Sequence, residues 1–172
     1  MDRRSFISKA SGKKNLQLEE PPLPSGGLAI YSGPWTDNEV THLLKRTMFG
    51  ARKVDIDYFK TRSLTQSVDE LLNPTAPLPP PPLKEYTPAT SVLIPDNNIA
   101  LGTTWVFDSN NDGSIYSYRR ASFKKWWMGV MLNQDRSIRE KMTLFWHNHF
   151  ATETADINNS QFVYNHHNLL RT

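Results

Sequence analysis

Proline dominates one segment of this chain and separates two regions that can form regular helices. Eight of the twelve prolines lie between Pro74 and Pro95, and residues 77–83 read Pro-Leu-Pro-Pro-Pro-Pro-Leu. Each proline ring fixes φ and removes a backbone hydrogen-bond donor, so no helix can continue through this run. We therefore expect an extended span over residues 74–100 that covers the domain as a stiff spacer. Docking onto an aromatic groove of a partner is the alternative.

The first 35 residues are polar and interrupted by glycine and proline, and we interpret them as a flexible leader. The leader contains Arg3-Arg4, which resembles a twin-arginine export motif. The residues that follow, 10–15, are not the apolar stretch that a signal peptide uses. The compartment therefore stays open between the cytoplasm and export. No apolar stretch approaches the roughly 18 residues that a membrane-spanning helix requires.

Composition excludes several kinds of site. The chain has no cysteine, so disulfides, thiolate zinc sites and cysteine nucleophiles are excluded. The formal charge is only +3. Four cations lie near the tryptophans, and we interpret them as the solvated face of a helix: Arg119, Arg120, Lys124 and Lys125. No nucleic-acid partner is therefore expected. A glycine-rich phosphate loop, a nucleophile-elbow serine and a His-Glu-x-x-His zinc motif are all absent.

Capping boxes mark where several helices begin. Thr36 with Glu39 and Ser63 with Gln66 each place a hydroxyl three residues before a glutamate or glutamine. They predict helices that end near Gly50 and before Pro74, with a further helix over 54–60 between them. A third box, Ser137 to Glu140, predicts a helix that begins at Ile138.

Residues 104–118 predict a small β-hairpin, because aromatic and β-branched residues flank a polar turn. The turn also matches the first positions of an EF-hand calcium loop, with Asp108, Asn110, Asp112 and Gly113. The twelfth position should be glutamate and is Arg119, so the EF-hand is excluded. A calcium loop of another kind stays open beside an ordinary turn. From Ser122 the apolar residues return to helical spacing.

Four of the five histidines lie in the last two predicted helices. In the first of them, one apolar face is shared by Ile138, Met142, Phe145 and His149. His147 points nearly opposite, toward Glu140, Thr143 and Leu144. In the second helix the apolar face is formed by Phe162, His166, Leu169 and Leu170, with His167 near its edge. We therefore expect His149 and His166 to face inward.

Two inward histidines and a carboxylate from the intervening link, such as Glu153 or Asp156, would form a site for iron, zinc or copper. We name His147, His149 and His166 as candidate ligands of a divalent transition metal. Glu140 and His147 are the candidate acid–base residues, and a pocket here would also be lined by Trp146. The alternative is that these histidines are core residues hydrogen-bonded to a carbonyl or carboxylate.

Three stretches resemble a bacterial family known as domain of unknown function 1800: residues 42–50, residues 68–74 with their proline-rich sequel, and residues 139–152. Residues 164–171 resemble the helix that follows in that family, where the position of His166 or His167 is more usually a polar amide. The resemblance covers roughly residues 36–172 and implies a mostly helical protein of unknown role. Since members are generally several hundred residues long, it also implies that this chain is the N-terminal part of a longer domain.

The fold expected is mainly α, an irregular helical bundle over residues 36–172 with a proline-rich span and a small hairpin. The domain is expected to be incomplete, with the missing C-terminal part of the same protein needed for stability. The leading expectation is a helical protein of unknown molecular function, and two alternatives stay open. The first is a metal-dependent hydrolase or oxidase that uses the Trp-His-Asn-His segment at 146–149, and the second is a non-catalytic surface or assembly module.

Overall fold

The structure is a computed structural model that describes residues 30–87, 96–108, 113–150, 156–157 and 159–172. The chain divides into two compact units, Met1–Gly33 and Pro34–Thr172. Nearly all of the first unit, where we predicted a leader, lies outside the described residues.

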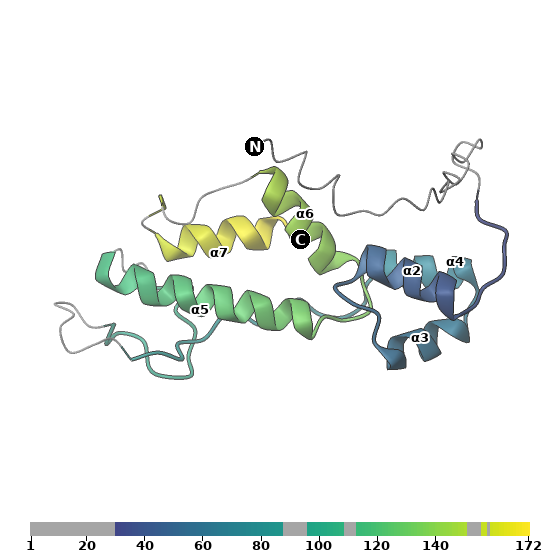
Figure 1. Cartoon of the computed structure of the whole chain (residues 1–172). Coiled ribbons are helices and arrows are strands. Elements are labelled where there is room, and N and C mark those ends of the chain that lie inside the picture. Colours follow the sequence, from purple (N-terminus) through teal and green to yellow (C-terminus); the bar gives the residue numbers. More distant parts are fainter. Residues whose placement is uncertain (1–29, 88–95, 109–112, 151–155, 158) are drawn as a thin grey trace, which may run out of the picture. The chain divides into compact units, whose positions relative to one another are not determined.

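The fold is mainly helical, as predicted (Figure 1). The described residues form six helices, which are α2 (Asp37–Thr47), α3 (Lys53–Lys60), α4 (Leu64–Leu72), α5 (Gly113–Leu132), α6 (Arg139–His149) and α7 (Ser160–Leu169). Within the described part, pairing of the β type is limited to a single antiparallel bridge between Leu83 and Thr104. Helix α7 lies beside α5, and α6 contacts α5 as well.

Both N-terminal capping boxes form as the sequence predicts. The backbone N–H of Thr36 donates to Glu39 over 2.9 Å, at the start of α2. At the start of α4, the N–H of Gln66 donates to the hydroxyl of Ser63 over 3.2 Å. These bonds satisfy N–H groups that have no partner within the helix, which is why the two helices begin where they do.

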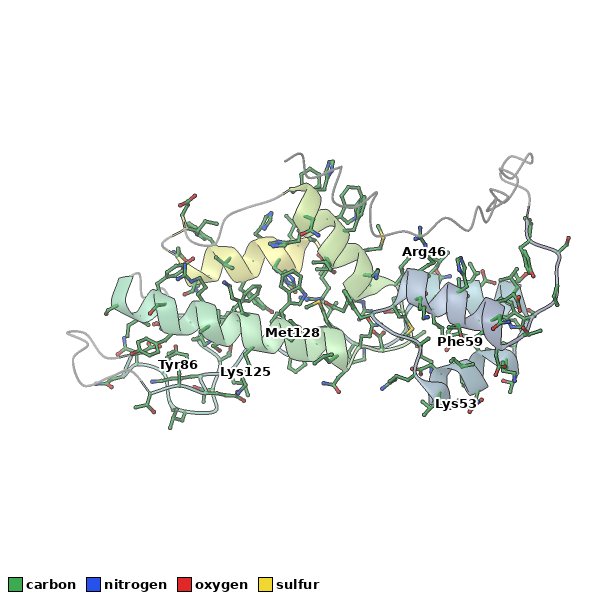
Figure 2. The ribbon with its side chains drawn as sticks, viewed as in Figure 1. Arg46, Lys53, Phe59, Tyr86, Lys125 and Met128 are labelled. Carbon is green, nitrogen blue, oxygen red and sulfur yellow. The ribbon has the colours of Figure 1, made fainter. Side chains whose placement is uncertain are left out.

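Helices α2, α3 and α4 enclose one small core. Its buried residues are Val40, Leu44, Met48, Phe59 and Leu71. Phe59, labelled in Figure 2, is fully buried, and its backbone carbonyl accepts a hydrogen bond of 3.2 Å from the indole of Trp35. Val40 and Leu44 lie on one face of α2, which therefore faces this core, and α4 contributes Leu71.

The predicted β-hairpin is wrong. Residues 114–118 belong to α5, a helix of 20 residues that begins at Gly113. The buried side chains of α5 are Ile115, Tyr116, Arg119 and Phe123, which are spaced as one face of a helix. Aromatic and β-branched residues favour strands only where a sheet exists to bury them. Here burial against neighbouring elements decides in favour of the helix.

The described part of the proline-rich span runs along α5 and reaches α6, and its carbonyls serve as acceptors. The indole of Trp126 donates to the Pro80 carbonyl over 2.7 Å, and the hydroxyl of Ser122 donates to the Leu83 carbonyl over 2.8 Å. Arg139 of α6 donates to the carbonyl of Ala76 over 3.0 Å. An extended proline segment leaves such carbonyls free of internal hydrogen bonds. The described part of the span therefore packs along α5 and α6.

A buried charge network joins the end of this span to α5. Arg119 donates two hydrogen bonds to the carboxylate of Asp96, of 3.1 Å and 2.6 Å, and also pairs with Asp108. Tyr86, labelled in Figure 2, donates to Asp96 over 2.5 Å. Burial alone would raise the pKa of Asp96, but the hydrogen bonds from Arg119 and Tyr86 outweigh it and hold that pKa below its ordinary value.

This network also determines whether the Asp108 carboxylate is available to a calcium ion in the turn at 108–113. Arg119 uses the Asp108 carboxylate that a calcium ion would need, and a further guanidinium N–H donates to the Asp108 carbonyl over 3.0 Å. Arg119, which stands where an EF-hand has its glutamate, therefore occupies the carboxylate of the first loop position. The other candidate ligands of this turn, Asn110 and Asp112, lie outside the described residues.

We predict that Arg119→Met destabilises the protein by about 3–5 kcal/mol, because it leaves Asp96 buried without its cation. Urea unfolding followed by circular dichroism measures the change. Lys124→Met, on the exposed side of the same helix, is the matched control and should change the free energy of unfolding by less than about 0.5 kcal/mol. Equal effects of the two substitutions would show that the network does not support the fold.

Candidate functional site

Helices α6 and α7 turn polar side chains inward. On α6 the buried residues are Glu140 and Thr143, and His147, which follows on the same face, is half-buried. On α7 and just beyond it, the buried residues are Ser160, Val163, His167 and Arg171, again three or four residues apart. Each helix therefore buries a mainly polar stripe.

An ion pair joins the two stripes. Arg171 Nε lies 2.6 Å from Glu140 Oε1, and Arg171 Nη2 lies 2.9 Å from Glu140 Oε2. Glu140 is 2% exposed and Arg171 is 6% exposed, so the pair is almost completely removed from water. The guanidinium carbon also lies 5.0 Å from the centre of the Trp126 ring, which places the cation over an aromatic face of α5.

The predicted orientation of the histidines is wrong in two respects. His149 is exposed and contacts only exposed or partly exposed rings in the described structure, those of Phe145, Trp146 and Phe150. His167, expected at an edge, is 1% exposed. His166 is half-buried. The relative directions of His147 and His149 on the helix were predicted correctly, but the inward face is the one that carries His147.

The third predicted capping box, Ser137 with Glu140, forms only in part. Ser137 does accept a hydrogen bond from the backbone N–H of Arg139, over 3.3 Å, close to the predicted helix start. Glu140 does not reach back to complete the box, because Arg171 takes its carboxylate. The N–H of Ile138 donates instead to the Leu71 carbonyl of α4, over 3.0 Å. The ion pair with Arg171 has therefore replaced the local hydrogen bond that Glu140 would make in a capping box.

Three imidazoles meet where α6 faces α7. The ring centre of His147 lies 5.9 Å from that of His167 and 6.2 Å from that of His166. Trp127 of α5 forms one side of this cluster, with its ring centre 3.9 Å from His167 and 5.0 Å from His147. Two imidazoles that share a metal have ring centres roughly 5–6 Å apart, since each bound nitrogen lies about 2 Å from the ion.

Buried nitrogens in this cluster have no hydrogen-bond partner among the described residues. They are both ring nitrogens of His167, Nδ1 of His147, and Nε1 of Trp127. A buried polar group without a partner costs about 1–3 kcal/mol, so each one calls for an explanation. His167 is therefore not a core histidine hydrogen-bonded to a carbonyl or carboxylate of the described residues, which was the alternative interpretation.

The environment keeps these histidines neutral. Burial, followed by the charge of Arg171, lowers the pKa of His167 to about 2. Burial, followed by the neighbouring His166, also lowers the pKa of His147. A neutral imidazole keeps a lone pair that can bind a metal or accept a proton.

Of the sequence candidates, the structure brings together His147 and His166, leaves His149 on the other side of α6, and engages Glu140 with Arg171. Sequence reasoning missed three contributors, His167, Trp127 and Arg171. A signal for two of them was present, because Ser160, His167 and Arg171 repeat at helical spacing, as Glu140, Thr143 and His147 do. Asp156 is exposed, and Glu153 lies outside the described residues.

A pocket of about 640 Å³ lies between the proline-rich span and α5, beside this cluster. Its lining includes Pro80, Trp126, Val130 and Glu140. Of the residues that we expected to line a pocket, Glu140 does so here, whereas Trp146, His147 and His149 do not.

Within the described ranges, no three histidine, aspartate or glutamate side chains are arranged to hold one metal ion. A metal in the cluster would therefore bind fewer than three of these side chains and keep positions open for other donors. Among the same residues, no helix has the length and apolar character that crossing a membrane requires.

Comparison with known families gives one result. The family described as protein of unknown function (DUF1800) matches residues 42–172. The chain belongs to the DUF1800 family. The match includes the ion pair, all four histidines of the last two helices and the proline-rich span. No curated protein and no solved structure matches this DUF1800 chain.

We predict that Glu140→Gln lowers the free energy of unfolding by about 3–5 kcal/mol, because Arg171 would be left buried and unpaired. Thermal and urea unfolding measure the loss. Replacing both partners, as Glu140→Leu with Arg171→Met, should recover part of it. Glu85→Gln breaks an exposed pair with Lys125 and is the control, with a change below about 1 kcal/mol. A single substitution that costs no more than this control would contradict the role given to the pair.

Stability should also fall as the pH falls below 6.5. The folded pKa of His167 lies below the ordinary value of 6.5, so the unfolded chain binds a proton in this range that the folded chain does not. Between about pH 6 and about pH 4, His167 removes about 1.4 kcal/mol of stability per pH unit. Urea unfolding at several pH values measures the slope.

The slope should decrease in His167→Gln and remain in His149→Gln, which changes an exposed histidine on the other side of α6. A slope that is the same in wild type and His167→Gln would show that His167 is not buried in neutral form.

Proposed function

We propose that this DUF1800 protein binds a divalent transition metal between α6 and α7, with His147 and His167 as its protein donors. The observation that carries the proposal is the pair of imidazoles 5.9 Å apart, whose buried nitrogens include three without a hydrogen-bond partner among the described residues. Imidazole nitrogen suits zinc, copper, iron and nickel. His166, whose ring centre is 6.2 Å from that of His147, lies beside the two donors but is not placed to complete a three-residue site with them.

A metal with two protein donors keeps open coordination positions for water or a substrate. Open positions allow a metal to activate a bound water or to polarise a bound oxygen, and both hydrolytic and oxidative reactions begin in this way. Glu140 is held by Arg171 and therefore supports the packing of α6 against α7 rather than transferring protons. The proposal names two donors and assigns no reaction to the metal.

The test is metal stoichiometry in the full chain. We expect equilibrium dialysis against Zn²⁺ or Cu²⁺, with metal analysis of the protein, to give about one ion per chain in the wild type. His147→Gln and His167→Gln should each weaken binding at least tenfold, since each removes one of two donors. His149→Gln is the matched control and should bind as the wild type does, because His149 lies on the other side of α6.

Two outcomes would overturn the proposal. One is a wild-type chain that binds no metal under these conditions, and the other is binding that survives both His147→Gln and His167→Gln. Circular dichroism melts of each variant show whether lost binding merely follows lost folding. Because His166→Gln leaves both proposed donors in place, it should reduce affinity less than either of those substitutions.

A second candidate function is docking of another protein, because the outward faces of α6 and α7 are apolar. Phe145 and Phe150 are each 54% exposed, and on α7 Phe162 and Leu169 are 62% and 72% exposed. Large apolar side chains that a helix exposes together are typical of interaction sites. This candidate corresponds to the non-catalytic assembly module that the sequence left open.

A further inference from the structure

The outward face of α6 forms the floor of a groove. Its apolar lining residues are Ile138, Met142, Leu144 and Phe145, of which Ile138, Met142 and Phe145 follow at i, i+4 and i+7 and therefore form one stripe about 10 Å long. The groove lies between this stripe and the end of α2, and its volume is about 510 Å³. The stripe lies on the side of α6 opposite His147, so the groove is separate from the histidine cluster.

Cations surround this apolar floor. Lys45 and Arg46 come from the last turn of α2, and Lys141 comes from α6. Arg46, labelled in Figure 2, stands at the end of α2 that borders the groove. No carboxylate lines the groove, and none of the three cations forms an ion pair in the part of the chain that the structure describes.

Interaction with the helix dipole accounts for part of this arrangement. Cations in the last turn of α2 are stabilised by the partial negative charge of its carbonyls. That explanation does not extend to Lys141, which lies in the first turn of another helix, where the dipole disfavours a cation. The Lys141 ammonium lies 5.0 Å from the centre of the Phe49 ring, which holds it near the end of α2. Three positive charges thus converge on one apolar stripe.

A ligand for this groove must combine an apolar ridge with negative charge beside it. A stripe of side chains at i, i+4 and i+7 packs against the equivalent ridge of a second helix. Amphipathic helices bind apolar grooves through anchors at this spacing, and flanking charges select the partner. A flat membrane surface would meet the cations but not fill a floor that lies between two helices.

We infer that this groove binds an acidic amphipathic helix of a partner protein, whose apolar ridge contacts Ile138, Met142 and Phe145 and whose carboxylates pair with Lys45, Arg46 and Lys141. The inference deepens the second candidate function, docking of another protein. It does not depend on the metal proposal, because the two sites use opposite sides of α6.

The test uses two synthetic helical peptides of 18 residues. Both carry leucine at i, i+4, i+7 and i+11, and the flanking positions are glutamate in one peptide and lysine in the other. Fluorescence anisotropy of the labelled peptides measures binding to the full chain. We expect the glutamate peptide to bind at least tenfold more tightly than the lysine peptide, and its affinity to fall as salt is added.

Charge reversal in the protein gives the sharper comparison. Lys45→Glu with Arg46→Glu and Lys141→Glu should reverse the preference, so that the lysine peptide binds more tightly. Lys124→Glu, an exposed position on α5 away from the groove, is the matched control and should keep the wild-type preference. Met142→Asp should weaken the glutamate peptide at least tenfold. Because these positions are exposed or half-exposed, thermal melts should show that every variant still folds.

Several results would overturn the inference. They are failure of both peptides to bind, equal binding of the two, or a preference that survives the charge reversal. Binding to vesicles of anionic lipid that is as tight as binding to the glutamate peptide, and is lost in the same variants, would assign the groove to a membrane surface instead. The variant His147→Gln separates the two proposals, since it should lose metal and keep peptide binding.

Discussion

The ion pair between Glu140 and Arg171 is the interaction on which the arrangement of the last three helices depends. Each partner alone would be too costly to remove from water, so the two must be buried together and with good geometry. The 2.6 Å and 2.9 Å contacts meet that requirement, and the Trp126 ring covers the guanidinium. Once this pair is buried, the polar stripes of α6 and α7 must face each other. Their apolar stripes must then face outward.

Both proposed sites follow from this one constraint. The inward orientation carries His147 and His167 against Trp127, where burial keeps them neutral and leaves ring nitrogens without a partner. The outward orientation exposes Phe145 and its stripe beside the cations at the end of α2. A helix with its apolar stripe inward would have neither feature. The metal proposal and the docking proposal are therefore separate in chemistry but share one structural cause.

The features that could be predicted from sequence are those that neighbouring residues decide. The capping boxes at Thr36 and Ser63 need only a side chain and the backbone three residues away, and the proline-rich span follows from the ring itself. The hairpin over 104–118 and the inward position of His149 were wrong because distant residues decide them. Apolar spacing identified the stripes of α6 correctly, but only Arg171, 31 residues after Glu140, determines which stripe is buried. Of the three histidine candidates for a metal, His147 and His166 lie in the cluster between α6 and α7, and His149 lies on the exposed side of α6.

Chemical modification of the histidines tests the central claim, the inward polar faces of α6 and α7, most directly. Diethyl pyrocarbonate reacts with accessible neutral imidazole, and peptide mass spectrometry reports each position separately. The exposed His149 should react rapidly, and His167, at 1% exposure, should be protected until the protein unfolds. Reaction of the native protein at His167 as fast as at His149 would contradict the account, because the polar stripe of α7 would then lie on the surface.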